Sequence, residues 1–251
     1  MPLADHETVL CWTPAGLVEA SDAPAGPLLV ADSWLLDDGH VRAGAAHWAR
    51  FEGSCAQAGA DVAEVARFRA AVAAALPASG RWFPRVELGE EGLALRVRRA
   101  PPVAPKASVE VAVPGDPRHL PGVKGPDLEL LAGLRAASPA DEVLLCDDAG
   151  ALLEGALSSL LWWEGDALCS TPDELILPGV TRAVLLVLAR RRGIEIRLRS
   201  PLPAELAGRE VWLTSALHGI RAVSEWLAPE QPAGAPLRAK EWRAELARAG
   251  R

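Results

Sequence analysis

The sequence predicts a mixed α/β chain of the α+β kind, divided into two domains. The chain has 251 residues, half of them hydrophobic, which is enough for one large or two modest cores. Segments with strand-like alternation and segments with helical periodicity follow one another along its length. Three prolines and two glycines within residues 114–122 then predict a linker between an N-terminal domain, 1–116, and a C-terminal domain, 117–251.

The N-terminal domain is predicted as two strands, two helices and three further strands. An apolar run marks the first strand at 27–36, and the turn at 37–39 leads into a short second strand. Helices are expected at 43–60 and 62–76, where apolar residues recur at helical spacing. The last three strands are expected at 81–86, 93–98 and 109–113.

The C-terminal domain is predicted to begin with a helix at 127–137 and to continue with hairpins. Its strands are expected at 143–146, 151–154, 159–163, 194–199 and 210–213. The strongest helical signal follows residues 177–182, because its apolar run ends in three arginines and a glycine at 190–193. Basic residues followed by glycine are typical of a helix C-terminus. The Pro/Ala-rich tail after Leu227 is expected to end in a helix.

Composition and charge argue against several classes of protein. The net charge of −7 is unfavourable for a nucleic-acid-binding surface. No apolar run reaches the ~20 residues of a membrane helix, and the N-terminus lacks the basic and then apolar design of a signal peptide, so we expect a cytoplasmic protein. The four cysteines form no Cys-x-x-Cys pair and are interpreted as reduced core residues rather than disulfides or a metal site: Cys11, Cys55, Cys146 and Cys169.

Several common enzyme motifs are absent from the sequence. It contains no Gly-x-Gly-x-x-Gly, no Gly-x-Ser-x-Gly and no His-Glu-x-x-His. Residues 115–124 have the glycines and lysine of a P-loop but not its spacing, and Gly125 stands where a hydroxyl should bind magnesium. The chain has no tyrosine, and only three of its 26 basic residues are lysines. A mechanism that needs a phenol is therefore excluded.

The remaining polar residues suit the binding of pyridoxal phosphate. This cofactor needs a lysine amine for a Schiff base, a carboxylate against its pyridine nitrogen, and donors around its phosphate. Lys124 is the best of the lysines because apolar residues precede it, whereas Lys106 lies in a proline-rich segment and Lys240 in the polar tail. Glu154 lies among apolar residues, where a carboxylate must be paired. A strand-end glutamate that reaches water is the alternative.

Two further segments are candidates for the phosphate site. Gly179, Val180 and Thr181 open the strong helix, whose first N–H groups are available to an anion. The alternative is an ordinary helix cap that binds nothing. Thr214 and Ser215 place two hydroxyls at the end of a strand, which alone is a weak signal.

Taken in order, these residues resemble the class IV aminotransferases. This family contains branched-chain and D-amino acid aminotransferases and aminodeoxychorismate lyase. The resemblance covers nearly all of the C-terminal domain, and within the N-terminal domain residues 47–51 are similar to the family's His-x-x-Arg-Leu helix. It rests on Val123-Lys124, residues 144–150, Glu154-Gly155, Ser158, residues 177–182, residues 213–215 and Gly219-Ile220.

The resemblance implies the family's fold, with a smaller N-terminal α+β domain and a larger C-terminal pyridoxal-phosphate-binding domain that has a β-barrel-like core. It also implies a homodimer. Lys124 is implied as the Schiff-base lysine that also shuttles the proton on the substrate's α carbon, and Glu154 as the partner of the pyridine nitrogen. The other implied cofactor-binding residues are Arg50, Ser158, Ser159, Gly179, Val180, Thr181, Thr214 and Ser215.

The chain departs from the family pattern at three places. Ser159 stands where asparagine usually follows the serine, and residues 125–127 replace the common His/x-x-Asn stretch. Residues 31–35 replace a Tyr-Gly-Asp-Gly-x-Phe-Glu-Thr-like segment that helps shape the substrate pocket. Without a tyrosine, the sequence leaves the substrate-carboxylate residue open among Trp34, Arg81, Arg96, Arg98 and His218.

The resemblance implies a transaminase that moves an amino group from an amino acid to a 2-oxo acid. A lyase of the aminodeoxychorismate type, which releases pyruvate and 4-aminobenzoate, is one alternative. The other is a non-catalytic homologue that keeps the fold, an idea motivated by the trimmed N-terminal domain. The retention of Lys124 and Glu154 argues against this second alternative.

Overall fold

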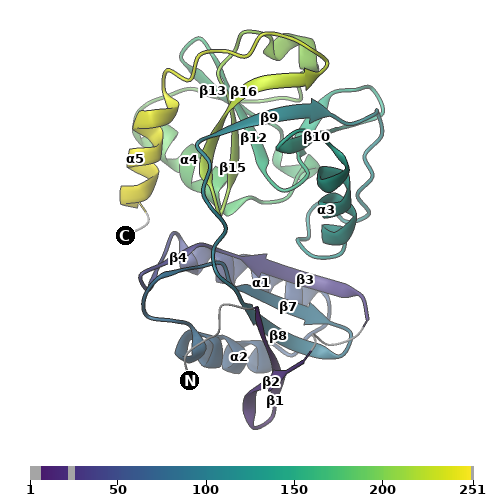
Figure 1. Ribbon diagram of the computed structural model, residues 1–251, viewed down its shortest axis with the longest axis vertical. Coiled ribbons are helices and arrows are strands. Elements are labelled where there is room, and N and C mark those ends of the chain that lie inside the picture. Colours follow the sequence, from purple (N-terminus) through teal and green to yellow (C-terminus); the bar gives the residue numbers. More distant parts are fainter. Residues whose placement is uncertain (1–6, 22–25, 250–251) are drawn as a thin grey trace. The chain divides into compact units, whose positions relative to one another are not determined.

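A computed structural model describes residues 7–21 and 26–249, which form two compact units (Figure 1). Unit 1 contains the described residues up to Pro102 together with Val123–Pro126, and unit 2 contains Val103–Gly122 and Asp127–Ala249. The sequence analysis placed the division at residues 116 and 117. In the structure the chain first passes from one unit to the other at Pro102 and Val103, and residues 114–122 belong to unit 2.

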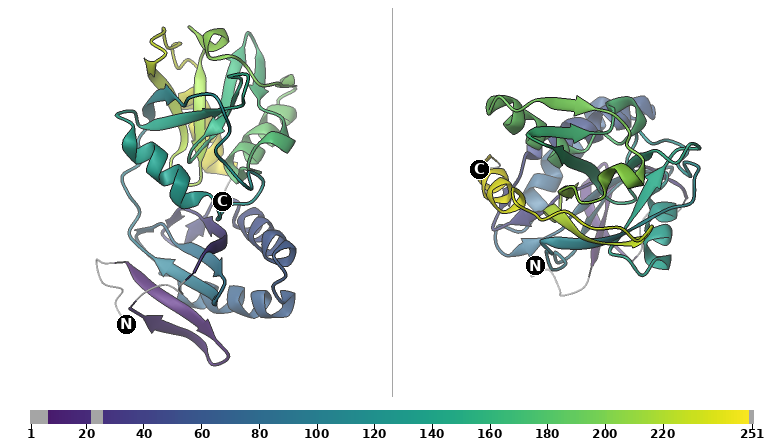
Figure 2. Two further views of the ribbon diagram at one scale, coloured as in Figure 1. Left: turned by 90° about the vertical axis from the view of Figure 1, so that its right-hand side faces the viewer. Right: turned by 90° about the horizontal axis from the view of Figure 1, so that it is seen from above.

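Unit 1 is an antiparallel sheet covered by two helices. Its strand order is β2-β1-β8-β7-β3. The strands are Thr8–Thr13 (β1), Gly16–Ala20 (β2), Leu28–Ser33 (β3), Arg85–Gly89 (β7) and Gly92–Val97 (β8). A small second sheet consists of Leu36–Asp37 (β4), His40–Val41 (β5) and Arg81–Trp82 (β6). The helices α1 (Gly44–Gln57) and α2 (Val62–Ala75) lie on one face of the larger sheet (Figure 2).

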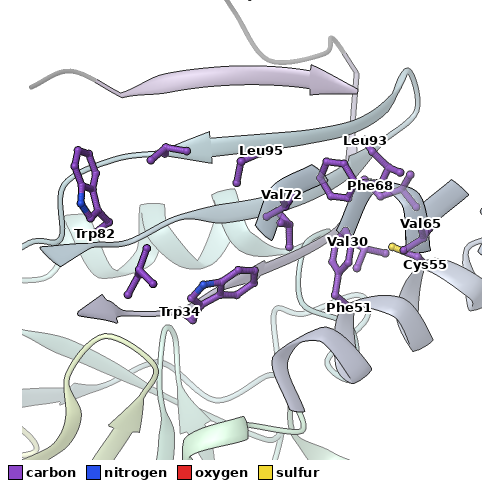
Figure 3. Close-up of a cluster of buried hydrophobic side chains, with 14 residues drawn as sticks. Val30, Trp34, Phe51, Cys55, Val65, Phe68, Val72, Trp82, Leu93 and Leu95 are labelled. Carbon is purple, nitrogen blue, oxygen red and sulfur yellow. The ribbon is translucent and has the colours of Figure 1, made fainter. Parts of the chain in front are cut away.

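The core of unit 1 lies between this sheet and its two helices (Figure 3). Phe51 of α1 and Phe68 of α2 are fully buried there, with ring centroids 6.4 Å apart. Asp61 caps α2, because its carboxylate accepts a hydrogen bond of 2.8 Å from the N–H of Ala63. Val65 and Val72 are buried on the same face of α2, which confirms the helical spacing of apolar residues predicted for this segment.

Unit 2 is built on a curled sheet of eight strands in the order β11-β10-β9-β16-β15-β12-β13-β14. The strands are Lys106–Val111 (β9), Glu142–Cys146 (β10), Leu152–Gly155 (β11), Ser159–Glu164 (β12), Ala167–Ser170 (β13), Ile196–Leu198 (β14), Val211–Ser215 (β15) and Gly219–Ala228 (β16). The helices are Leu128–Ala137 (α3), Val180–Arg191 (α4) and Ala239–Ala249 (α5), with short 3-10 turns at Asp173–Leu175 and Pro203–Leu206. The predicted α+β fold with a barrel-like second sheet is confirmed. Over the described ranges, no helix combines the length and the apolar composition that crossing a membrane requires.

Strands β1, β2, β13 and β16 were not predicted from the sequence, and the strand predicted at 109–113 in the N-terminal domain is β9 of unit 2, where it pairs with β10 and β16. The longest of these, β16, pairs with β9 in parallel and with β15 in antiparallel fashion, so it is an interior strand of the sheet. Its charged Arg221 is nevertheless buried, because the guanidinium lies 3.3 Å from the carboxylate of Glu142. A buried ion pair interrupts the apolar alternation on which strand prediction depends.

Candidate functional site

Unit 2 brings together four segments that the sequence analysis assigned to the cofactor. Ser159 and Thr214 are partners in the β12–β15 ladder, and the hydroxyl of Thr214 donates to the carbonyl of Ser159 at 3.4 Å. Gly179 lies against Ser159, because a Cβ atom at Gly179 would stand 2.3 Å from the Ser159 hydroxyl. Glu154 joins this group through the N–H of Leu177, which donates to its carboxylate at 3.0 Å. Residues far apart in the sequence thus form one contiguous group.

Helix α4 begins inside this group, and its N-cap residue, Gly179, has no side chain that could cap the first backbone N–H groups. Its first turn also contains no acidic residue. Val180 and Thr181 are both buried, so these donors are largely removed from water. Burying uncapped N–H groups costs free energy, and the helix dipole favours an anion as their partner. This end of α4, with the hydroxyl of Ser159 beside it, is therefore suited to a phosphate group.

Arg182 fixes the first turn of α4 to the end of β13. Its guanidinium donates to the hydroxyl of Ser170 at 2.6 Å, to the carbonyl of Thr171 at 2.7 Å and to the carboxylate of Asp173 at 2.5 Å. These bonds account for all three donor groups of the guanidinium. Arg182 therefore belongs to the scaffold that presents the helix N-terminus.

Glu154, the carboxylate predicted for the pyridine nitrogen, is buried and paired with Arg118. Arg118 Nη1 donates to Glu154 Oε1, and the two side chains are 2% and 7% exposed. Asp116 accepts two further hydrogen bonds of 2.8 Å from the same guanidinium, and the carbonyl of Leu175 accepts one of 2.9 Å. Burial opposes the charge of Arg118, but Asp116 and Glu154 outweigh it and raise the pKa of the guanidinium. Arg118 is not among the site residues predicted from the sequence, because the composition of residues 114–122 indicates a linker.

Asp127 orders the loop that follows Arg118. Its carboxylate accepts hydrogen bonds of 2.9 to 3.0 Å from the N–H groups of His119 and Leu120 and lies 2.9 Å from His119 Nδ1. Burial raises the pKa of Asp127, but these hydrogen bonds have the larger combined effect and hold it below its usual value. The proline- and glycine-rich stretch is thus an ordered loop of unit 2 rather than a linker.

Ser158 lies in a second buried cluster of unit 2. Its hydroxyl donates to Glu142 Oε2 at 2.7 Å, and Arg221 Nη2 lies 3.3 Å from the same oxygen. Glu142 is completely buried, and desolvation raises its pKa although Ser158 and Arg221 act in the opposite direction. Ser158 therefore fastens the turn between β11 and β12, the turn that follows Glu154.

Arg50, predicted to bind phosphate, lies on α1 of unit 1 beside a buried carboxylate. Its Nε and Nη2 atoms donate to Asp32 at 2.8 Å each, and His47 Nδ1 lies 2.8 Å from Asp32 Oδ1. Burial raises the pKa of Asp32, but His47 and Arg50 together hold it below its usual value. The structure therefore presents Arg50 in a fixed orientation that depends on Asp32.

The segment that carries Lys124 is bound to β3 within unit 1. The carbonyl of Lys124 accepts a hydrogen bond of 2.6 Å from the N–H of Ala31. At Gly125 the backbone has a φ of +145°, and a Cβ atom there would stand 2.8 Å from the Cα atom of Val30. Only glycine fits this close approach. The sequence analysis assigned Lys124 to the C-terminal domain, whereas its segment groups with unit 1 and Glu154 belongs to unit 2.

The candidates for the substrate carboxylate have the following surroundings. Trp34 is part of the core of unit 1, and Arg81 lies 3.5 Å from Asp37. Arg96 donates to Glu87 at 2.9 Å, and Arg98 donates to the carbonyl of Phe83 at 3.2 Å. The Nδ1 atom of His218 accepts a hydrogen bond of 3.2 Å from the N–H of Ala104. His218 is the only one of these candidates in unit 2, and it lies in the turn between β15 and β16, three residues after Ser215.

His218 is expected to make the stability of the protein dependent on pH. Burial, aided by the charge of Arg221, lowers the pKa of its ring from 6.5 to about 4. The unfolded chain therefore binds the additional proton between pH 6.5 and about 4, so stability is complete above pH 6.5 and decreases as the pH falls. For this half-buried ring we expect a loss of about 1 kcal/mol from pH 7 to pH 5. Urea denaturation at both pH values measures it.

His218→Gln should remove most of this pH-dependent loss, because glutamine does not titrate. His40→Gln is the matched control, since His40 is exposed at the start of β5. If the His218→Gln variant loses as much stability between pH 7 and pH 5 as the wild type does, the assignment of the effect to His218 is wrong.

Comparisons with known proteins bear on the family and the fold of the chain. The sequence model of the family described as amino-transferase class IV matches residues 29–226. A hypothetical aminotransferase from Mycobacterium tuberculosis in its PLP-bound form superposes with a TM-score of 0.79 at 18% identity, covering 98% of this chain and 99% of that chain. A fold IV transaminase from Curtobacterium pusillum gives 0.73 at 22% identity, covering 96% and 97%. A putative 4-amino-4-deoxychorismate lyase from Legionella pneumophila gives 0.71 at 16% identity, covering 91% and 97%. Among curated protein sequences there is no significant match.

Proposed function

The chain belongs to the class IV aminotransferases, and on this premise we propose that it is a transaminase that moves an amino group from an amino acid to a 2-oxo acid. The match over residues 29–226 confirms the family that the sequence motifs predicted. Class IV aminotransferases use pyridoxal phosphate, the predicted cofactor. When bound, this group supplies an aldehyde that condenses with amines and a protonated ring that withdraws electrons from the substrate.

The buried and uncapped N-terminus of α4 is the observation that supports the proposal most strongly. The N–H groups of Val180 and Thr181 would donate to the phosphate of the cofactor, and the N-cap Gly179 brings the Ser159 hydroxyl next to them. Thr214, paired with Ser159 in the neighbouring strand, and the adjacent Ser215 would add further hydroxyls. The backbone N–H groups at this end of α4 and the hydroxyls beside them would together form a binding site for a dianion.

Glu154 and Lys124 would perform the two chemical tasks that remain. The carboxylate of Glu154 would accept a hydrogen bond from the pyridine N–H and so keep the proton on that nitrogen. The Nζ atom of Lys124 would hold the cofactor and, once the substrate's amino group has replaced it there, would be free to accept and return the proton of the substrate's α carbon. The hydrogen bond from Ala31 and the tight fit at Gly125 hold the backbone of this lysine in place.

Arg50→Ala is expected to weaken the binding of pyridoxal phosphate by roughly 10- to 100-fold. A hydrogen bond to a charged group contributes about 1.5–3 kcal/mol, and the bidentate contact with Asp32 already orients the Arg50 guanidinium. Absorbance titration of the cofactor-free protein measures the affinity. Arg69→Ala is the control, because Arg69 lies on the same unit and pairs with Glu52 at the surface. An Arg50→Ala variant that binds the cofactor as tightly as the Arg69→Ala variant would remove Arg50 from the phosphate site.

We also propose that the protein is a homodimer, as the resemblance implies. Helix α3 contains no buried residue, although Leu130 and the partly buried Leu131 and Leu134 give it an apolar surface. Such a surface is typical of a contact between subunits.

The transaminase proposal is tested with cofactor-loaded protein from which unbound pyridoxal phosphate has been removed. Addition of single amino acids should convert the aldehyde form of the cofactor to its amine form, and a 2-oxo acid should reverse the change. Release of pyruvate and 4-aminobenzoate from aminodeoxychorismate, without any amine form, would favour the lyase instead. A protein that takes up no cofactor would contradict both enzymes.

A further inference from the structure

The loop of residues 116–118 holds a guanidinium against the carboxylate of Glu154, 36 residues further along the chain. We propose that Arg118 is a positioning residue, which keeps the Glu154 carboxylate ionised and fixes its orientation toward the pyridine nitrogen of the cofactor. This inference rests on the proposed function and deepens it by adding a residue that acts on the cofactor only through Glu154.

Arg118 is fixed by contacts that do not involve Glu154. Asp116 accepts from the Nε and Nη2 atoms at 2.8 Å each and from the backbone N–H of Arg118 at 3.0 Å. The carbonyl of Leu175 accepts a fourth hydrogen bond, of 2.9 Å, from Nη2. These bonds hold the planar guanidinium in one orientation, and its remaining Nη1 group donates to Glu154. A flexible lysine ammonium could not reproduce this fixed geometry.

The same oxygen of Glu154 accepts from two directions. Oε1 receives the Nη1 group of Arg118 and, at 3.0 Å, the backbone N–H of Leu177. Two donors on one oxygen restrict the rotation of the carboxylate. Because Leu177 lies two residues before Gly179, the same contact ties the carboxylate to the N-terminus of α4. The two ends of the predicted cofactor site, the pyridine end and the phosphate end, are therefore held at a fixed distance within unit 2.

The charges of this cluster favour a cationic partner. An ionised carboxylate that is 7% exposed needs a nearby positive charge, which Arg118 supplies. Asp116 offsets part of the charge of Arg118 in turn, so Arg118 does not cancel the negative charge of Glu154 completely. Asp127 also acts on Arg118 electrostatically and adds to the negative field. Glu154 is thus ion-paired with a guanidinium whose own charge is partly offset by Asp116 and Asp127, which leaves the carboxylate suited to a protonated pyridine nitrogen.

Carbon-13 NMR of the cofactor-free protein, labelled at the side-chain carboxyl carbon of glutamate, tests the proposal. Comparison with Glu154→Gln identifies the Glu154 signal. In Arg118→Met this signal should titrate about one to three pH units higher than in the wild type, because the adjacent positive charge is lost. Arg118→Lys should restore most of the shift, since it keeps the charge. Arg199→Met, which breaks the Arg199–Glu164 pair of the same unit, should leave the Glu154 signal unchanged.

Cofactor affinity separates this proposal from the proposed function. Arg118→Met and Arg118→Lys should both bind pyridoxal phosphate several-fold more weakly than the wild type, because the lysine variant lacks the fixed geometry. Equal midpoints for Glu154 in the wild type and Arg118→Met would overturn the proposal, as would wild-type affinity in both variants. If Arg118→Met does not fold, the test rests on Arg118→Lys. Wild-type affinity of that variant for pyridoxal phosphate would then show that Arg118 does not orient Glu154. A wild-type protein that binds no cofactor would instead refute the proposed function, whatever the NMR titration shows.

Discussion

Lys124→Ala is expected to abolish both the visible absorption of the cofactor-loaded protein and its transaminase activity. Alanine has no amine that could bond to the aldehyde of pyridoxal phosphate or move a proton at the substrate's α carbon. Absorbance spectra recorded after removal of unbound cofactor, followed by turnover measurements with an amino donor, check this result. Retention of the wild-type absorption band in the variant would show that another residue holds the cofactor.

The other two lysines provide matched controls for this experiment. Lys106→Ala and Lys240→Ala remove the same functional group at the start of β9 and in α5, and both variants should keep the absorption band. Lys124→Ala should also leave the melting temperature nearly unchanged. Its backbone carbonyl, which accepts from Ala31, and the following Gly125 are both retained. A loss of the band therefore reports on the amine and not on unfolding.

Glu154→Gln is expected to slow the reaction of the bound cofactor with an amino donor by about 100-fold or more, while the cofactor remains bound. Glutamine has nearly the same shape but no negative charge, so it does not stabilise the protonated ring that accepts electrons from the substrate. Loss of one electrostatic partner of a developing charge costs on the order of 10²–10³ in rate. Stopped-flow absorbance under single-turnover conditions measures this step.

Glu164→Gln is the control variant, because it also replaces a glutamate that is paired with an arginine. Glu164 contacts Arg199 in the same unit, and hydrogen bonds from Trp162 and Arg199 lower its pKa to about 2. Its replacement should cost stability but leave the rate of the half-reaction unchanged. A Glu154→Gln rate within about twofold of that of the control would remove Glu154 from the mechanism.

Local sequence patterns predicted the helices whose caps and buried faces are set by neighbouring residues in the sequence. The helix α2 has its cap, Asp61, and its buried face within one short segment. The helix α4 has its glycine, its apolar run and its terminal arginines in a single stretch. The motifs of unit 2 likewise predicted the family through their order along the chain. Each of these motifs lies at the end of a strand or helix. Ser159, Gly179 and Thr214 are close together in the structure, although their individual signals are weak.

The features that the sequence could not reveal depend on partners that are distant along the chain. Arg118 acquires its role from Glu154, and Arg50 acquires its orientation from Asp32, 18 residues away. Strand β16 is stabilised by its neighbours, and its Arg221 is tolerated only because of Glu142. The composition of residues 114–122 indicated a flexible linker, yet prolines and glycines also form rigid turns when a carboxylate such as that of Asp127 binds their backbone.

The amine of Lys124 is the group through which we expect the protein to bind pyridoxal phosphate. Reduction of the cofactor-loaded protein with sodium borohydride fixes the cofactor permanently to the amine that holds it, and peptide mass spectrometry then locates the added mass. We expect this mass in the peptide that contains Lys124 and in neither of the peptides that contain Lys106 or Lys240. An adduct on one of those two lysines, or a reduced protein without any adduct, would contradict the role proposed for Lys124.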